Sequence, residues 1–371
     1  MARTGAFRLT DRLRPAITHH SDWAWLSAPS GVWRAKITQE SLDISDDVLS
    51  LKEDLTAAGG ELEIELRNDH GRYNSPGTGD IALLNIGNEL VFSPGFRTTG
   101  GNETSDGQSF SLEAYEHVNS PGKSTLVLRA FDGWNLLGNF RASHQFRWNK
   151  TGEELSVKGI LAYILARLGL RLEVNSQSAI ITSFYPDFTI NPDDRGDAIV
   201  NRLLGFVPDI LRIEGATAYI INPQATDAAS YSYGTGHAVL EGKYGKSALR
   251  QNMVEVEGCD PQTGEPIIKY VFDWDETGRL PQRRLRIEDR NLSSTTQAEE
   301  RGESILRKTA VTGDAGFIVI PVNCGQQLYD VIEITDPRAG LDAEKKRVLK
   351  IGLIYQPAHA RYEMRLGLGN V

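Results

Sequence analysis

Apolar and polar residues alternate along several short segments in the first part of the chain. Residues Trp33–Thr38, Gly60–Leu66 and Ser109–Tyr115 follow the two-residue period of a strand with one side facing solvent. Residues Thr125–Phe131 form a further candidate strand with a less regular alternation. Several short strands separated by turn residues are typical of antiparallel sandwiches and barrels. We therefore predict an N-terminal β-barrel domain over residues 1–148.

Two stretches interrupt this strand pattern and are predicted loops. They are Asn68–Gly79 and Thr98–Gln108, the second because Gly, Asn, Thr and Ser dominate it. Glycine makes up 36 of the 371 residues, with 15 prolines beside it. This composition also indicates many short strands joined by tight connections, with helix as the minority element.

Helical periodicity begins after residue 149 and predicts a small αβ domain over residues 149–230. Thr151–Glu154 matches a capping box, in which the Thr151 side chain accepts from the first turn and Glu154 reaches back. The predicted helix ends at Gly169, a suitable residue for a left-handed C-terminal position. Its apolar face consists of Val157, Ile160, Leu161, Ile164, Leu165 and Leu168.

A second helix and a hairpin complete this predicted domain. The helix is expected from Pro192, at a first-turn position, to Gly205. The hairpin consists of Asp209–Glu214 and Thr217–Asn222, joined by a two-residue turn. Together these elements predict a small sheet covered by helices.

Strand patterns return in residues 231–371, which we predict to form a C-terminal β-barrel domain. One helix interrupts it, starting at a capping box at Thr296 and running to about Ala310, with Gly313 behind it. The expected strands are Ala248–Glu257, Ile267–Phe272, Gly316–Val322, Val331–Thr335, Arg347–Tyr355 and Arg361–Leu368.

Charge and cysteine content exclude several classes of protein. The chain has 40 basic and 49 acidic residues, a formal net charge of −9, so it lacks the general basic surface that grips nucleic acid. Two cysteines, Cys259 and Cys324, form no disulfide framework. Residues 1–20 lack the apolar run of a secretory signal, and no stretch approaches 18 apolar residues. We expect no stable membrane insertion.

Motifs for nucleotide or calcium binding are incomplete. Gly77–Gly79 and Gly234–Gly236 lack a third glycine at the required spacing and a following helix, so they are predicted turns. Asp273–Gly278 begins like a calcium loop, but Arg284 stands where the loop needs a bidentate glutamate. A hairpin turn is the favoured interpretation of Asp273–Gly278.

Catalytic and metal-binding patterns are also absent from the sequence. No HExxH, CxxC, CxxH or G-x-S-x-G pattern occurs. The carboxylate pairs Glu153–Glu154 and Asp193–Asp194 lie at predicted helix starts, where the helix dipole favours negative charge. We therefore predict no catalytic, cofactor-binding or metal-binding residue, no cofactor and no enzymatic activity. A glycosidase acid pair stays open as an alternative, because its members need not be neighbours in sequence.

Five tryptophans lie in the first block, and two roles are possible for them. Trp23, Trp25 and Trp33 lie in the first strand region, and Trp134 and Trp148 flank the end of the block. Packing in a core or between domains is favoured over a sugar-binding platform.

Several segments together resemble a known family. Glu61–Tyr73 contains a strand that ends in an N-D-x-G-R-Y turn, and Ile86–Phe92 and Leu126–Gly133 follow as further strands. Near the C-terminus, the helix Ala298–Arg307 precedes Ile320–Asp336, in which Asp330 and Asp336 mark the ends of a strand, and Arg347–Ile351. This arrangement is similar to tail hub proteins of tailed bacteriophages and gene transfer agents. The resemblance covers most of the chain.

The resemblance implies a fold, an assembly and a set of partners. The fold is mainly β with an α+β insertion, namely two tube-type β-barrel domains flanking the small αβ domain. The assembly is a homotrimer whose six barrels match a hexameric tail tube. Its partners are tail tube or distal tail proteins and tip, fibre or baseplate proteins, with DNA present only in transit through the lumen. At 371 residues the chain is too short for the lysozyme or peptidase extensions that some hubs carry.

Function follows as an expectation with two alternatives. We expect a structural protein of the virion tail tip or baseplate, assembled in the bacterial host cytoplasm, that closes the tail tube and serves host entry and genome ejection. One alternative is a carbohydrate-binding or carbohydrate-active β protein, and the other is a hexameric tube or distal-ring subunit. In the hub, we expect a neutral to acidic lumen, with Arg279–Arg286 facing a partner or solvent.

Overall fold

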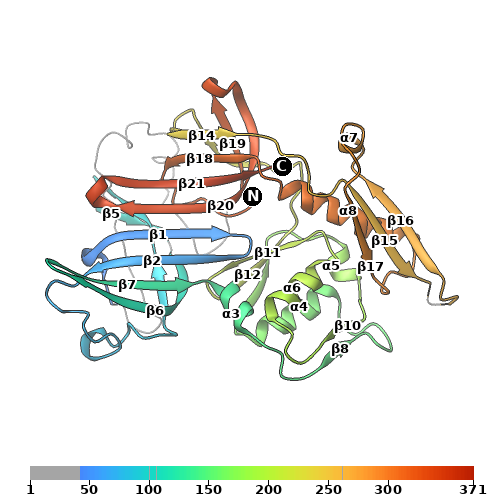
Figure 1. Ribbon diagram of the computed structural model, residues 1–371, viewed down its shortest axis with the longest axis horizontal. Coiled ribbons are helices and arrows are strands. Elements are labelled where there is room, and N and C mark those ends of the chain that lie inside the picture. The colour runs from blue at the N-terminus through green and yellow to red at the C-terminus, as the bar shows by residue number, and fades with distance from the viewer. Residues whose placement is uncertain (1–41, 100, 106, 261) are drawn as a thin grey trace.

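The computed structural model describes residues 42–99, 101–105, 107–260 and 262–371 (Figure 1). The predicted strand Trp33–Thr38 and the tryptophans Trp23, Trp25 and Trp33 lie outside these residues. Strand is the main secondary structure, as predicted. Among the described residues, no helix combines the length and the apolar character that crossing a membrane requires.

A large sheet of eleven strands joins the two predicted β blocks (Figure 1). Its path runs β14-β18-β21-β20-β1-β2-β7-β6-β3, and β19 and β13 continue beside β20. The blocks meet where β1 of the first pairs antiparallel with β20 of the second. The strands are β1 (Val48–Thr56), β2 (Gly59–Arg67), β3 (Glu89–Phe92), β6 (Gln108–Ser120), β7 (Lys123–Phe131), β13 (Ala229–Tyr233), β14 (Glu241–Tyr244), β18 (Gly316–Pro321), β19 (Val331–Asp336), β20 (Leu341–Gln356) and β21 (Arg361–Gly369).

Alternation along these strands separates an apolar face from a charged face. Leu62, Ile64 and Leu66 of β2 are buried, whereas the glutamates between them lie on the other side of the sheet. The register brings residues of the same side into line across neighbouring strands, as in the pair Ile64 and Leu128. The apolar faces of both blocks contribute to one continuous hydrophobic core.

A small αβ domain lies below this sheet in the view of Figure 1. It has its own core, which includes Trp134 and Trp148 at 7% and 9% exposure. Core packing of these two tryptophans is therefore confirmed. The elements are α3 (Gly133–Asn139), β8 (Phe146–Trp148), α4 (Val157–Ala166), β9 (Arg171–Val174), α5 (Ile180–Ser183), β10 (Phe188–Ile190), α6 (Gly196–Leu204), β11 (Ile210–Glu214) and β12 (Thr217–Ile221). The predicted hairpin is confirmed as the antiparallel pair β11–β12.

The predicted capping box at Thr151 is wrong, because α4 starts later. Its N-cap is Ser156, whose hydroxyl accepts from the backbone N–H of Gly159 at 3.4 Å. The side chain of Asn149 accepts from the backbone N–H of Glu154 at 2.7 Å and of the next residue at 2.9 Å. These two backbone N–H groups therefore have hydrogen-bond acceptors while the segment is a loop. The helix begins only after them.

The second predicted helix also begins later than expected. Asp193 has a φ of 68°, a left-handed conformation that cannot continue a helix from Pro192. Helix α6 therefore runs from Gly196, and Gly205 follows its last residue, as predicted.

A three-stranded sheet that belongs neither to the main sheet nor to the αβ domain lies at the right of Figure 1. Its order is β16-β15-β17, and helix α8 packs against it. A small separate core of Val254, Val256, Leu292, Ala298 and Leu306 joins helix and sheet. The bounds are β15 (Met253–Cys259), β16 (Pro266–Phe272), α7 (Trp274–Thr277), β17 (Arg284–Glu288) and α8 (Thr295–Val311). The boundaries at residues 148 and 230 stay predictions, although α3 and β8 precede residue 149 and pack in the core of the αβ domain. The sheet β16-β15-β17 is a distinct layer within the last segment.

Two local predictions in this layer are corrected. Asp273–Gly278 is no hairpin turn, because β17 pairs parallel with β15 on the side away from β16. The segment forms the one-turn helix α7, in which the Asp273 side chain accepts from the backbone N–H of Glu276 at 2.9 Å. Helix α8 begins one residue before the predicted Thr296, because Ser294 is its N-cap.

The two predicted loops have different outcomes. Residues 68–78 contain no strand, as expected. Thr98–Gln108, however, includes β5 (Gly101–Thr104), which pairs with β4 (Gly95–Thr98). Its Gly-Asn-Glu-Thr sequence shows no apolar alternation, so only the pairing with β4 reveals the strand. Short 3₁₀ turns also occur at Ser45–Asp47, Gly79–Ile81, Pro337–Ala339 and Pro357–His359.

Candidate functional site: a polar junction between the β blocks and the αβ domain

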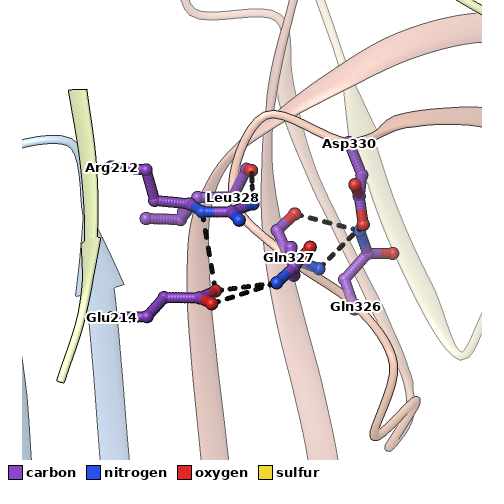
Figure 2. Close-up of polar contacts among 6 residues, drawn as sticks. All are labelled: Arg212, Glu214, Gln326, Gln327, Leu328 and Asp330. Carbon is purple, nitrogen blue, oxygen red and sulfur yellow. Dashed lines mark hydrogen bonds and ion pairs between the residues drawn. The ribbon is translucent and has the colours of Figure 1, made fainter. Parts of the chain in front are cut away.

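A buried loop between β18 and β19 is the centre of a polar region in the interior of the protein. The Asp330 carboxylate accepts from the Gln326 side chain at 3.0 Å and from the Gln327 backbone N–H at 2.8 Å (Figure 2). Tyr329 has a φ of 69°, which a non-glycine residue adopts only when its surroundings hold it. Its backbone N–H donates to the carbonyl of Val348 at 2.7 Å.

The hairpin β11–β12 presents two charged side chains to this loop. Leu211 and Ile213 face the core of the αβ domain, so Arg212 and Glu214 project from the opposite side of β11. The Gln327 amide donates to both Glu214 carboxylate oxygens, at 2.9 and 3.1 Å (Figure 2). The loop and the αβ domain are therefore joined by charge-assisted hydrogen bonds.

Arg212 reinforces the same contact. It is 5% exposed, donates from Nη1 to the Leu328 carbonyl at 3.3 Å, and has Nε 3.5 Å from a Glu214 oxygen. Its guanidinium carbon also lies 5.0 Å from the ring centre of Tyr219. A buried cation is tolerated here because a carboxylate, a carbonyl and an aromatic face surround it.

Arg347 of β20 is a second buried cation at the junction. It is 1% exposed and donates to the Tyr329 carbonyl at 3.0 Å, to the Gln224 carbonyl at 2.9 Å and to the Asp227 carboxylate at 3.0 Å. One guanidinium therefore ties β20, the loop before β19 and the segment that leaves the αβ domain.

Two tyrosine hydroxyls form hydrogen bonds with the polar groups on the inner side of the loop. Tyr233 donates to the Gln326 side-chain oxygen at 2.7 Å and accepts from Asn323 at 2.8 Å. Tyr231 donates to the Gly325 carbonyl at 2.9 Å. Burial raises the pKa of Tyr233 well above its usual value, so this hydroxyl remains a neutral donor.

A cavity of about 230 Å³ lies beside the junction, lined by residues that include Glu53, Tyr219 and Asn323. Burial raises the pKa of the Cys324 thiol in its wall to about 12, so this cysteine is not an activated nucleophile. Among the described residues, no group of three His, Cys, Asp or Glu side chains could hold a metal ion. The arrangement can hold three parts of the chain in one geometry.

Residues singled out in the sequence lie apart from one another. Gly77 and Gly234 adopt positive φ in turns, as predicted. Asp330 and Asp336 lie at the two ends of β19, also as expected. The junction contacts of Arg212, Glu214 and Arg347 were not predicted from the sequence. For the first two, the available signal was a charged pair two residues apart in an otherwise apolar strand, Ile210–Glu214.

The fold defines the class of protein to which this chain is similar: phage tail proteins and baseplate-hub proteins. A tail protein from Neisseria meningitidis matches with a TM-score of 0.67 and 8% identity over 92% of this chain and 97% of that one. The 43 kDa tail protein of prophage MuSo2 from Shewanella oneidensis matches with a TM-score of 0.62 and 13% identity over 91% and 98%. The resemblance to tail hub proteins and the mainly β fold class are thereby confirmed at the level of the fold.

A third neighbour extends the likeness to secretion systems. This Escherichia coli protein, a component of the type VI secretion system described as structurally similar to the bacteriophage T4 tail proteins gp27 and gp5, matches with a TM-score of 0.52 and 12% identity over 91% of this chain and 77% of its own. No protein-family model matches the chain, and no curated protein matches it in sequence.

Proposed function

We propose that the protein is a structural hub of a phage-like tail, which closes the tail tube and connects it to tip or baseplate components. One observation carries the proposal: the two β blocks join edge to edge, through β1 and β20, in a single sheet. Two fused blocks per chain allow three copies to supply six blocks. A ring of that kind matches the hexameric tail tube above it.

The ends of the sheet path support ring closure. Strand β14 ends the path on one side and β3 ends it on the other, next to the longer β6. An edge strand leaves backbone donors and acceptors unpaired and favours pairing with another chain. In the proposed trimer, an edge of the second block in one copy meets an edge of the first block in the next copy.

The charged face of the main sheet is suited to line a channel for DNA. Acids and bases on it nearly balance and are largely paired, for example Lys123 with Glu65 at 2.7 Å and Arg129 with Glu63 at 3.3 Å. Paired cations offer few free contacts to phosphate, so DNA would pass without being held. The charged residues placed on this face by register include Lys52, Asp54, Glu61, Glu63, Glu65, Arg67, Glu89, Glu116, Lys123, Arg129, Glu241, Lys243, Lys350, Arg361, Glu363 and Arg365.

The arginine-rich segment Arg279–Arg286 lies away from the face that we propose to line the channel. Arg284 and Arg286 lie on β17, in the separate sheet, and pair with Glu255 and Glu257. This placement is consistent with our expectation that Arg279–Arg286 faces a partner or solvent. We propose that the lumen is neutral rather than basic.

Light scattering of the purified protein tests the assembly. We expect a particle of three times the 41.0 kDa chain mass, and threefold symmetry at the tube end in cryo-microscopy of tails. A hexamer would instead identify a tube or distal-ring subunit. A monomer that binds or cleaves polysaccharide, and loses cleavage when one Asp or Glu is changed, would refute both the hub and the non-enzyme proposals.

A further inference from the structure

The layer formed by β15, β16, β17 and α8, which we call the α8 unit, is connected to the main sheet at one place. Its strands pair only with one another in the described part of the chain, and α8 packs against β15 and β16. The chain enters the unit through the exposed residues 245–248 and leaves it through residues 312–315, and neither connection contains a helix or a strand. The backbone N–H of Gly245 donates to the Ala315 carbonyl at 3.1 Å, so the two connections lie side by side. Two adjacent irregular connections can act as a hinge.

A second face of α8 meets the αβ domain where helix α6 ends (Figure 1). The Nζ of Lys308 donates to the carbonyl of Leu204, the last residue of α6, at 2.5 Å. The guanidinium carbon of Arg301 lies 5.3 Å from the ring centre of Phe206. Beside these contacts, the Phe184 side chain packs against the cores of both the αβ domain and the α8 unit. The carbonyls at a helix end attract cations, which explains why both cationic side chains point to the end of α6.

Arg301 is buried in this contact without a full set of partners. It is 9% exposed, and its Nε and Nη1 atoms have no hydrogen-bond partner among the described residues. Burial lowers the pKa of Arg301, and the negative charge of Asp289 opposes this shift without forming an ion pair within the described residues. A buried charge without a paired carboxylate costs free energy, which the Phe206 ring offsets only in part. Separation of α8 from the αβ domain would return the guanidinium to water.

We propose that the α8 unit detaches from the αβ domain as one body, turning about the hinge at residues 245–248 and 312–315, and that Arg301 favours this release. In the attached state, the interface keeps the guanidinium from water. In the detached state, water solvates it, while the unit keeps its own core, which includes Val254, Val256 and Leu306. Lys308 brings a second cation to the same interface, so attachment places two positive charges there together. The contact is therefore poised to open.

Amide hydrogen exchange of the full-length protein tests this release. The reporters are the backbone N–H groups of Gly205, Phe206 and Val207, which are hydrogen-bonded at the end of α6 and lie beside α8. We expect Arg301→Met, which keeps a long side chain but removes the charge, to slow their exchange at least fivefold. The reason is that an apolar side chain stabilises the attached state and makes opening rarer. A substitution at a buried contact more commonly has the opposite effect.

Control measurements separate release from a general gain in stability. Exchange in β15, which lies within the core of the α8 unit, should be the same in Arg301→Met as in the natural protein. The matched variant Arg290→Met, at an exposed position of the same unit, should leave the reporters unchanged. Phe206→Ala removes the ring beside Arg301 and should speed the exchange of Gly205 and Val207 at least fivefold. Circular dichroism checks that each variant is folded.

Several outcomes would overturn the proposal. Unchanged or faster exchange of the reporters in a folded Arg301→Met variant would show that the charge does not favour release. Equally slowed exchange in β15 would show that the substitution stabilises the α8 unit itself. Exchange of the reporters at the rate of β2 in the main sheet would show that only global unfolding exposes them. Because the assay needs no assembled tail, none of these outcomes bears on the proposed hub function.

Discussion

Replacing Arg347 with methionine removes the side chain that ties three parts of the chain together. The guanidinium donates to two backbone carbonyls and to Asp227, and methionine has a similar length but no donor. The carbonyls of Tyr329 and Gln224 then lose a donor in the interior. We expect the variant to fold with a weakened junction.

The size of the effect follows from burial. Breaking a buried ion pair by removing one partner costs about 3–5 kcal/mol. Two features of the site reduce the loss: the Asp227 side chain is 37% exposed, so water can solvate it, and Nε of Arg347 has no hydrogen-bond partner among the described residues. We therefore expect a loss near the lower end, about 3 kcal/mol, and about half that for Arg347→Lys, which keeps the charge but not the planar fork.

Chemical denaturation followed by circular dichroism measures this loss. Limited proteolysis should in parallel show faster cleavage in residues 222–228, the segment that Arg347 anchors. Arg171→Met is the matched control, because Arg171 belongs to an exposed pair with Glu173 and its loss should leave the midpoint unchanged. An Arg347→Met variant within about 1 kcal/mol of the natural protein, with unaltered proteolysis, would refute the assigned role.

Three further predictions concern backbone geometry, pH and the junction. Gly316→Ala should destabilise by roughly 3 kcal/mol in denaturation, because φ is 104° and the new Cβ would lie 1.9 Å from a carbonyl oxygen of β14; a stable variant would contradict this. Burial lowers the pKa of Lys308 from 10.5 to about 7, so the unfolded chain binds more protons between these values and this group makes stability rise with pH there. Comparing unfolding midpoints from pH 7 to 10 should show a smaller rise in Lys308→Met, and an identical profile would count against the assignment. A double-mutant cycle of Glu214→Gln and Gln327→Ala should give a coupling energy of about 1–2 kcal/mol, whereas additive effects would show that the contact adds no stability.

Local sequence patterns determined most of the individual elements. The alternation in Gly60–Leu66 correctly predicted β2, and Arg361–Leu368 was correctly expected as the strand β21. The hairpin β11–β12 followed from its two strands and short turn. Hydrophobic period acts over a few residues, so a single segment carries its own signal. The predicted starts of α4 and α6 were too early, because Asn149 and Asp193 impose loop conformations before each helix.

Tertiary structure alone decided how these elements combine. The pairing of β1 with β20 joins residues about 300 positions apart, and no periodicity within either strand encodes the choice of partner. The polar junction depends on the same long-range placement: Arg212, Gln327 and Arg347 become a site only when the folded chain brings β11, the loop and β20 together. A buried charge is stable only beside its partners, so its role is set by three-dimensional neighbours that the sequence places far away.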